Sequence, residues 1–348
     1  MKWKKCLGLM LAAALLCVTV LSGCAKQQTS VGGDGTTVLQ TTKVKLAAAR
    51  DTQLAPVIMC AVEKGFFKEV GIDAELVLFA SGADLVAAVA SGDVDLGSAG
   101  DTPATSLLTS DPGKYEFIAR TTNLGGALSL VVREGINTPQ DLIGKNIGYS
   151  VGNTSEALWQ ALVKETGIDA DQVTLTALGA ADMLTAFETK QIDGFVCWEP
   201  TVTNGVKLGG HRLLTGTKSY FNGVEADWEC LNSYALLCGS VEWIEAHPDT
   251  VTAVLTAMQK SSEWIDANLE DAAAIVGAQL SIELDDCISM MERNEYGLSV
   301  SDTLMTDLTN SAKFLYGGGK IPFVPDFKEM FDGSYLKAVD ESLVTVTE

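Results

Sequence analysis

A seven-residue segment that occurs twice constrains the fold of this chain more than any other feature. Residues 68–74 have the sequence KEVGIDA and residues 164–170 have KETGIDA, so six of the seven positions are identical. A lysine in the last turn and a glycine after it are typical of a helix that ends before a strand. Each copy is followed by a further matched segment, residues 83–89 in the first case and 181–187 in the second. The repeat therefore predicts two similar α/β lobes with a ligand-binding cleft between them.

The first residues indicate export rather than part of the fold. Three lysines lie within the first five residues, and residues 7–20 are uncharged, mostly apolar and short for a membrane span. The sequence LSGC at residues 21–24 resembles a bacterial lipobox, which implies cleavage before Cys24 and lipidation of its sulfur. An ordinary signal peptide with a chance cysteine is the alternative. We therefore expect a lipoprotein signal peptide at residues 1–23 and an anchor on the outer face of the bacterial cytoplasmic membrane.

A tether and a large folded region are expected to follow the signal. Residues 25–40 are rich in Gln, Thr, Ser and Gly and have too little apolar surface to order themselves, so we predict a flexible tether at residues 24–42. Roughly 300 residues remain, which is enough for two lobes with cores of their own. None of the later segments is long and apolar enough to span a bilayer. We expect a monomer whose only membrane contact is the lipid anchor.

Charge and cysteine content exclude several functions. The chain carries a formal net charge of −21, and such an acidic surface repels phosphate backbones, which argues against a nucleic-acid partner. No pair of cysteines has a CxxC spacing, and the only histidines, His211 and His247, neighbour no other candidate ligand. We therefore expect neither a metal site nor a bound cofactor. A disulfide between Cys230 and Cys238 is an open alternative, because an export signal permits one.

The hydrophobic pattern predicts strands alternating with helices along residues 43–198, which favours mostly parallel sheets covered by helices on both faces. The polar, glycine-bearing segment 121–126 is a predicted hinge, and the apolar segment 235–238 is the predicted second crossover. From residue 241 to the end, the pattern predicts helices. The two predicted lobes are residues 43–123 plus 236–348 for lobe 1 and residues 124–235 for lobe 2.

Four segments carry a resemblance to a known family. They are EKGFFKEVGI at residues 63–72, ASGDVD followed by GDTP within residues 90–103, DLIGKNIG at residues 141–148, and QIDGFVCWEP at residues 191–200. In this order, and behind a lipobox, they resemble the substrate-binding proteins of ABC importers for nitrate, taurine, alkanesulfonates and the thiamine pyrimidine precursor. The resemblance covers roughly residues 43–335.

This resemblance implies an α/β fold of the type II-like periplasmic-binding-protein kind, with two lobes and two hinge crossovers. It also implies that a small molecule is captured by lobe closure and delivered to the permease and ATPase subunits of an ABC importer. Relatives use the same scaffold for small oxyanions, sulfonates and heteroaromatic amines. The family therefore leaves the ligand open.

Three predicted strand-to-helix turns are the candidate ligand contacts. Helix N-termini carry free N–H groups and a partial positive charge, and they hold anions without a basic side chain. Ordinary helix capping by the same residue types is the alternative for each turn, and Asp101 or Thr102 is the predicted N-cap of the second helix. The residues in the three turns are Arg50, Asp51, Thr52 and Gln53; Gly100, Asp101 and Thr102; and Asn153, Thr154 and Ser155.

Trp198 and Glu199 end a predicted strand and are expected to face the cleft. Glu199 could bind an ammonium or ring amine, and Trp198 could supply a stacking or cation–π wall. The alternative is that Trp198 fills the core of its lobe and that Glu199 caps the next helix. Asn123 at the hinge is a further candidate contact.

The charges at this edge bear on the ligand. Arg50 and Arg120 are the only arginines predicted at the carboxyl ends of lobe 1 strands, where a sulfonate would favour a fork-shaped donor. Asp51, Asp101 and Glu199 crowd the same edge. This mixture favours an organic sulfonate or amino-sulfonate, with an aminopyrimidine-like ring as the competing ligand.

An enzyme is the rival class of function, because one relative of this fold makes the thiamine pyrimidine itself with a cysteine-rich run and a histidine. Here Cys197 stands alone in its segment, and neither histidine falls at a predicted cleft turn. The sequence has no nucleophile with an adjacent base, no glycine-rich phosphate loop and no metal cluster. We therefore expect no catalysis. A lipid-anchored sensor that docks to a receptor is a third possibility.

Overall fold

The structure is a computed structural model, and it describes residues 29–31, 37–39, 41–150, 154–228 and 230–347. The expected lipidation site Cys24 and the candidate ligand contact Asn153 lie outside these residues. In the described part of the chain, no helix is long and apolar enough to cross a membrane. Residues 1–40 and 41–348 are separate units. In the first, β1 (Thr29–Val31) pairs antiparallel with β2 (Thr37–Leu39), a hairpin that the composition of the predicted tether does not indicate.

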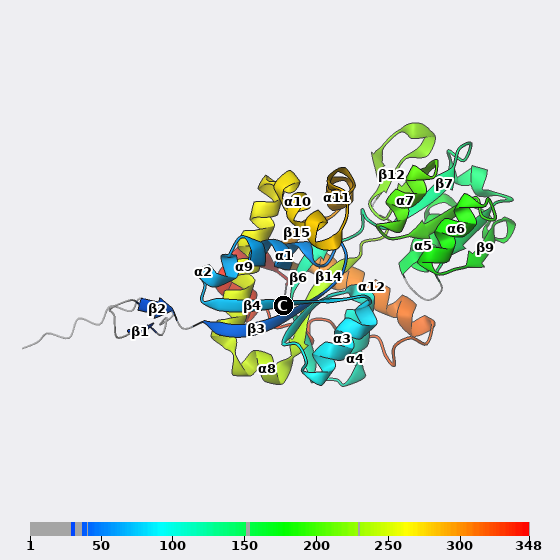
Figure 1. Cartoon of the computed structure of the whole chain (residues 1–348). Helices are drawn as coiled ribbons and strands as arrows, with labels where there is room; N and C mark the ends of the chain where they lie inside the picture. Colours follow the sequence, from blue (N-terminus) through cyan, green and yellow to red (C-terminus); the bar gives the residue numbers. More distant parts are fainter. Residues whose placement is uncertain (1–28, 32–36, 40, 151–153, 229, 348) are drawn as a thin grey trace, which may run out of the picture. The chain divides into compact units, whose positions relative to one another are not determined.

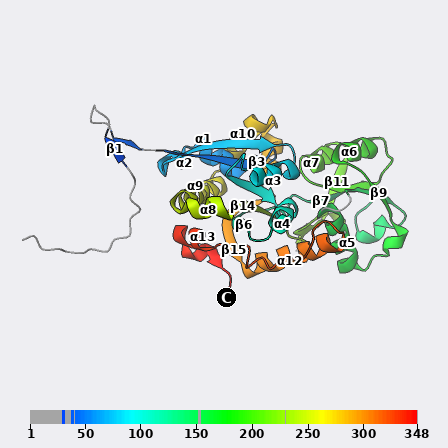
Figure 2. The same cartoon turned by 90° about the horizontal axis from the view of Figure 1, so that it is seen from below.

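The second unit contains two seven-stranded sheets, one in each lobe (Figure 1, Figure 2). The lobe 1 sheet has the order β16-β15-β6-β14-β5-β3-β4. Its strands are β3 (Thr42–Ala49), β4 (Ile72–Phe79), β5 (Leu96–Gly100), β6 (Tyr115–Asn123), β14 (Tyr234–Ser240), β15 (Glu295–Ser301) and β16 (Val344–Thr345). The lobe 2 sheet has the order β13-β12-β11-β7-β10-β8-β9. Its strands are β7 (Ser129–Arg133), β8 (Asn146–Tyr149), β9 (Thr174–Ala177), β10 (Gly194–Cys197), β11 (Gly210–Thr215), β12 (Lys218–Ser219) and β13 (Ala226–Asp227).

The prediction of mostly parallel sheets is wrong, because both sheets are mixed. In lobe 1, β3 pairs parallel with β4 and β5, but β14 runs antiparallel to both β5 and β6. In lobe 2, β8 pairs parallel with β9 and β10, whereas β7 and β11 are antiparallel to their neighbours. The chain leaves lobe 1 along β6 and returns along β14. Adjacent strands that carry the chain out and back must run in opposite directions.

Helices cover the two sheets. In Figure 1, α1 and α9 lie on one side of strands β3 and β4, and α3 and α4 lie on the other. The helices of lobe 1 are α1 (Pro56–Glu63), α2 (Phe66–Glu69), α3 (Gly82–Ser91), α4 (Asp101–Ser110), α8 (Val241–Ala246), α9 (Pro248–Ala267), α10 (Leu269–Leu280), α11 (Leu284–Met291), α12 (Asp302–Gly317), α13 (Ser334–Val339) and η4 (Glu341–Leu343). Those of lobe 2 are η1 (Pro139–Leu142), α5 (Thr154–Thr166), η2 (Ala170–Gln172), α6 (Ala180–Glu188), α7 (Thr201–Lys207) and η3 (Phe221–Gly223).

Several local predictions differ from the structure. The sequence pattern predicts a single helix over residues 54–70, but Gly65 has a φ of +75° and separates α1 from α2. Gly100, rather than Asp101 or Thr102, is the N-cap of α4. The region after residue 241 is not entirely helical, because β15 lies between α11 and α12. Every second residue of β15 is buried, the period-2 pattern of a strand.

The repeated segment does mark two helix exits. Gly71 after α2 has a φ of +77° and Gly167 after α5 has a φ of +66°, both in the left-handed region that ends helices. Each lobe has an apolar core of its own. A small cluster of Leu54, Leu124 and Ala235, with Trp198 packed against it, joins the two lobes at the crossovers. Leu54, Leu124 and Trp198 of this cluster also line the candidate site described below.

Candidate functional site

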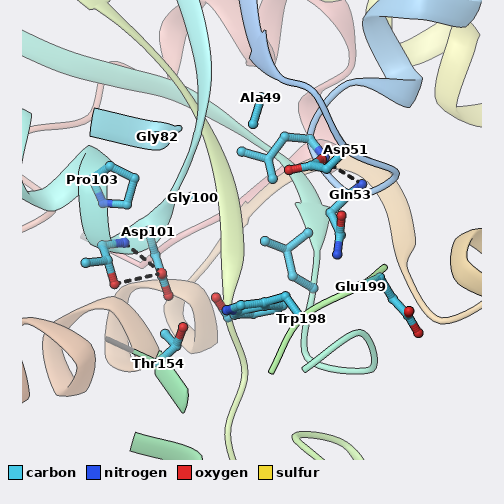
Figure 3. Close-up of a pocket in the computed structure, with 14 residues that line it drawn as sticks. Ala49, Asp51, Gln53, Gly82, Gly100, Asp101, Pro103, Thr154, Trp198 and Glu199 are labelled. Atoms are coloured by element: carbon cyan, nitrogen blue, oxygen red, sulfur yellow. Dashed lines mark hydrogen bonds between the residues drawn. The ribbon is translucent and has the colours of Figure 1, made fainter. Parts of the chain in front are cut away.

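A cavity of about 380 Å³ lies where the two lobes and both crossovers meet (Figure 3). All three predicted turns and the predicted strand end contribute to it. Leu54, which follows the first turn, also lines it, as do Leu124 and Ser233 at the crossovers. The last two could not be predicted because the crossovers carry no motif. The lining residues are Ala49, Asp51, Gln53, Leu54, Gly82, Gly100, Asp101, Thr102, Pro103, Leu124, Thr154, Trp198, Glu199 and Ser233.

Asp101 is the most buried acid of the cavity, with 3% of its surface exposed. It follows β5 directly, so the end of a buried strand carries its carboxylate to the cavity. Burial raises its pKa from the ordinary 3.8 to about 6, although donors in Thr102, Ser233 and Tyr234 lower it. Its Oδ1 accepts a hydrogen bond from the backbone N–H of Thr102 at 2.7 Å. The carboxylate therefore occupies the anion position at the N-terminus of α4.

Asp51 and Gln53 form the second polar element, in the turn after β3. Asp51 Oδ1 accepts hydrogen bonds from the backbone N–H groups of Gln53 at 2.9 Å and Leu54 at 2.7 Å. Burial raises the pKa of Asp51, and these two bonds lower it. Gln53 is 3% exposed, and its Oε1 has no hydrogen-bond partner among the described residues. Figure 3 shows this turn and Asp101 on two sides of the cavity, with Trp198 drawn between them.

Lobe 2 contributes Trp198, Glu199 and Thr154. Trp198 supplies an apolar wall and also packs against the core of its lobe. Glu199 is 5% exposed, and its carboxylate is already bonded. Its Oε2 accepts from the backbone N–H of Thr203 at 2.9 Å, and its Oε1 pairs with Arg212 Nη2 at 2.9 Å. The structure thus favours the capping alternative for Glu199 over direct recognition of an amine.

Four other candidates do not line this cavity. Arg50 is exposed and donates to the carbonyl of Gln279 at 3.3 Å. Thr52 is buried behind the turn, where its carbonyl accepts from the hydroxyl of Tyr296 at 2.6 Å. Asn123 accepts from the backbone N–H of Gly125 at 3.0 Å. Ser155 Oγ accepts from the N–H of Ser150 and donates to its carbonyl, both at 3.0 Å, which ties the start of α5 to the residue after β8.

Both arginines considered for a sulfonate are therefore absent from the lining. Arg50 points to α10, and Arg120 lines a different cavity together with Asn123 and Glu295. Among the described residues around the main cavity there is no lysine, arginine or histidine. The local charge is that of Asp51, Asp101 and Glu199, and within the described chain only Glu199 of these three has a cationic partner.

A second cavity of about 240 Å³ adjoins the first and shares Thr102 and Thr154 with it. It lies between α12 of lobe 1 and α5 of lobe 2. Its acid is Asp307, whose Oδ2 accepts from the hydroxyl of Tyr234 at 2.6 Å and from Asn232 Nδ2 at 3.1 Å. No sequence signal indicated Asp307, because the packing of α12 across the cleft cannot be seen in its helical pattern. The lining residues are Thr102, Thr154, Ala157, Gln160, Cys230, Leu231, Asn232, Asp307, Asn310, Ser311 and Phe314.

Two further chemistries can be assessed in the part of the chain that the structure describes. No group of three or more histidine, cysteine, aspartate or glutamate side chains is arranged to hold a metal ion there. Cys230 and Cys238 are both free thiols, so the disulfide considered from the sequence is not formed. Burial raises the pKa of Cys230 to about 12, which keeps it protonated.

A family model described as NMT1/THI5 like matches residues 51–272. The chain belongs to this family. It is 32% identical over 179 residues to the taurine-binding periplasmic protein of Escherichia coli, a match that covers 51% of this chain and 55% of that relative. It is 23% identical over 275 residues to the formylaminopyrimidine-binding protein of Halalkalibacterium halodurans, covering 75% and 76% of the two chains. These relatives are named as binding proteins and not as enzymes.

The crystal structure of the periplasmic aliphatic sulphonate binding protein SsuA from Escherichia coli has the same fold as this NMT1/THI5-like chain. The TM-score is 0.69 at 16% identity, over 83% of this chain and 96% of the other. The predicted two-lobe periplasmic-binding-protein fold is thereby confirmed. Because the chain spans only about half of the taurine-binding relative, that relative's name does not establish the ligand here.

Proposed function

We propose that this NMT1/THI5-like chain is an extracytoplasmic solute-binding protein that captures a small molecule between its lobes and delivers it to an ABC permease and ATPase. One observation carries the proposal. The main cavity is lined from both sides, by Asp51 and Asp101 of lobe 1 and by Thr154 and Trp198 of lobe 2. A ligand that contacts both sets can do so fully only when the lobes are together. It therefore shifts the population towards the closed state.

The lobes that move are residues 43–123 plus 236–348 and residues 124–235, with the crossovers as hinges. The LSGC sequence supports cleavage before Cys24 and a lipid anchor on the outer face of the cytoplasmic membrane. Residues 24–42 would then tether a monomer close to its permease. The periplasmic relatives named above support an extracytoplasmic location.

The lining favours an amine-bearing ligand over a bare sulfonate. The N–H group of Thr102 that a sulfonate would use at the start of α4 is already bonded to Asp101. An incoming anion would meet Asp51 and Asp101 with no basic side chain beside them in the described lining. Two relatives are named for taurine and for formylaminopyrimidine, and both of these ligands contain nitrogen. We therefore assign the recognition of a ligand nitrogen to Asp51, Gln53 and Asp101.

Hydrogen–deuterium exchange of the full chain tests lobe closure. Taurine, an aminopyrimidine and simple amines are added in turn, and exchange is compared at the N-termini of α4 in lobe 1 and α5 in lobe 2. A compound that binds is expected to slow exchange at both places together, because closure covers both. Protection of one lobe only, for every compound that binds, would contradict the proposal. Chemical conversion of a bound compound would contradict it as well.

A further inference from the structure

We propose that the ligand is an organic dication, with two protonated amino groups joined by a short apolar chain that spans the two adjoining cavities. This inference rests on the proposed function and specifies its ligand. One ammonium binds between Asp51, Gln53 and Asp101. The other binds at Asp307 in the second cavity.

The first ammonium position is defined by Gln53 Oε1, which has no partner among the described residues, together with the carboxylate of Asp51. An ammonium group has three N–H donors and no acceptor. Gln53 is almost completely buried, and its Oε1 has no donor among the described residues. Asp51 uses Oδ1 for two backbone bonds, and neither bond involves Oδ2. A buried acceptor without a partner is costly, so a ligand donor at this point contributes more than it would in water.

The acids themselves point to a cation. Asp101 lies opposite this turn, accepts hydrogen bonds from Thr102, Ser233 and Tyr234, and has no cationic partner among the described residues. Burial without a counter-ion penalises the charged form of both acids, as the raised pKa values of Asp51 and Asp101 indicate. An ammonium in the cavity that both acids line supplies the missing positive charge and charge-assisted hydrogen bonds.

The second ammonium position, at Asp307, has similar chemistry and lies in the adjoining cavity. Asp307 accepts from Tyr234 and Asn232 through Oδ2, and Oδ1 takes part in neither bond. Thr102 and Thr154 line both cavities, so a chain of methylene groups that passes them connects Asp101 with Asp307. Burial is the main cause that raises the pKa of the Tyr234 hydroxyl, and both carboxylates lie close enough to raise it further.

The walls between the two ends suit an apolar linker. Leu124 and Trp198 line the first cavity, and Leu231 and Phe314 line the second. A single divalent metal ion fits less well, because the acids are distributed over both cavities and form no three-ligand group in the described chain. A monoamine would leave Asp307 without a partner charge. The acids of the two adjoining cavities and the apolar walls between them therefore fit a diamine best.

Isothermal titration calorimetry of the full chain in detergent tests the inference. The probes are the α,ω-diamines from 1,3-diaminopropane to 1,6-diaminohexane, with 1-aminobutane, taurine and calcium chloride as comparisons. We expect one diamine length to bind at least tenfold more tightly than 1-aminobutane. In Asp307→Asn, which keeps an acceptor for Tyr234, this preference should fall below about threefold.

Asp111→Asn is the matched control. It removes the same charge, but Asp111 lies exposed at the other end of α4 from Asp101. It should retain the full preference for the diamine. If the diamines bind no better than 1-aminobutane, or if taurine or calcium binds more tightly than any diamine, the inference is wrong. Taurine that protects both lobes from exchange would then leave the proposed function intact. A diamine that binds selectively but protects lobe 1 alone would instead contradict lobe closure.

Discussion

Replacement of Asp101 by Asn should stabilise the unliganded protein at neutral pH. The pKa of Asp101 lies at about 6 in the folded chain, against an ordinary value of 3.8. The folded protein therefore binds this proton more tightly than the unfolded chain, and the stability that the proton provides is lost as the pH rises from 3.8 to 6. Asn is a neutral side chain of the same shape, and it removes this loss.

The magnitude follows from the shift. Each pKa unit corresponds to about 1.4 kcal/mol, so a shift of about two units makes ionised Asp101 cost about 3 kcal/mol above pH 6. With an unfolding entropy of about 2.1 cal/mol/K per residue, the folded unit of roughly 300 residues should gain about 5 °C in melting temperature at pH 7.5. Ser233 can rotate its hydroxyl to accept from the new amide, so few hydrogen bonds are lost.

Differential scanning calorimetry of the full chain at pH 7.5 and pH 4 measures the effect. The gain for Asp101→Asn should be present at pH 7.5 and nearly absent at pH 4, where the wild-type carboxyl is protonated. Asp141→Asn is the control of opposite sign. Hydrogen bonds from Asn137 and Thr138 lower the pKa of Asp141, so its loss should destabilise the protein at pH 7.5. An equal change for Asp101→Asn at both pH values would refute the reasoning.

Three further substitutions test the site and the hinge. Gln53→Met removes a buried acceptor that has no partner in the described chain, so it should stabilise the unliganded protein by about 1 kcal/mol. Ligand affinity measured by calorimetry should fall. A loss of stability would argue that Gln53 Oε1 has a hydrogen-bond donor. Lys207→Met breaks the exposed ion pair with Asp286 that joins α7 of lobe 2 to α11 of lobe 1. Affinity should fall no more than about fivefold, and high salt should abolish the difference. Gly126→Ala places a Cβ 2.2 Å from the carbonyl oxygen of Arg293, so the substitution should hold the lobes apart. We expect ligand affinity to fall at least about tenfold, which corresponds to about 1.4 kcal/mol. Unchanged affinity would show that the close approach of Gly126 to Arg293 is not needed for closure.

The sequence was sufficient to place most of the main cavity. Asp51, Gly100, Asp101 and Thr102 follow strands that the apolar pattern identifies, and the carboxyl ends of neighbouring parallel strands meet at one edge. Trp198 was found in the same way at the end of β10. Their place in the lining could be predicted because it depends on local pattern and on strand direction alone, whereas their contact with a ligand stays a prediction.

The remaining contacts depend on tertiary register, which the local pattern does not contain. The sequence predicts that Glu199 binds a ligand amine. In the structure Glu199 pairs instead with Arg212, which lies on β11, a strand that the sequence pattern does not indicate. Asp307 lies on a correctly predicted helix, yet its place beside Tyr234 depends on the packing of α12 against α4 and against β15, a strand that the sequence pattern does not indicate. A candidate side chain can thus be recognised locally, but whether its charge is free or taken depends on residues that are distant in the sequence.

That distinction explains why the sequence favours a sulfonate or amino-sulfonate ligand, whereas we propose an amine from the structure. From sequence, Arg50 and Arg120 balanced the acids at the same edge, and an amino-sulfonate satisfied both signs. In the structure both arginines lie away from the lining, Arg50 towards α10 and Arg120 at a different cavity, whereas Asp101 is buried with no cationic partner among the described residues. A cost of about 3 kcal/mol in the unliganded state is then offset when a cation arrives. Ligand binding should therefore raise the melting temperature of the wild-type protein more than that of Asp101→Asn, because the substitution removes the cost that the ligand would offset.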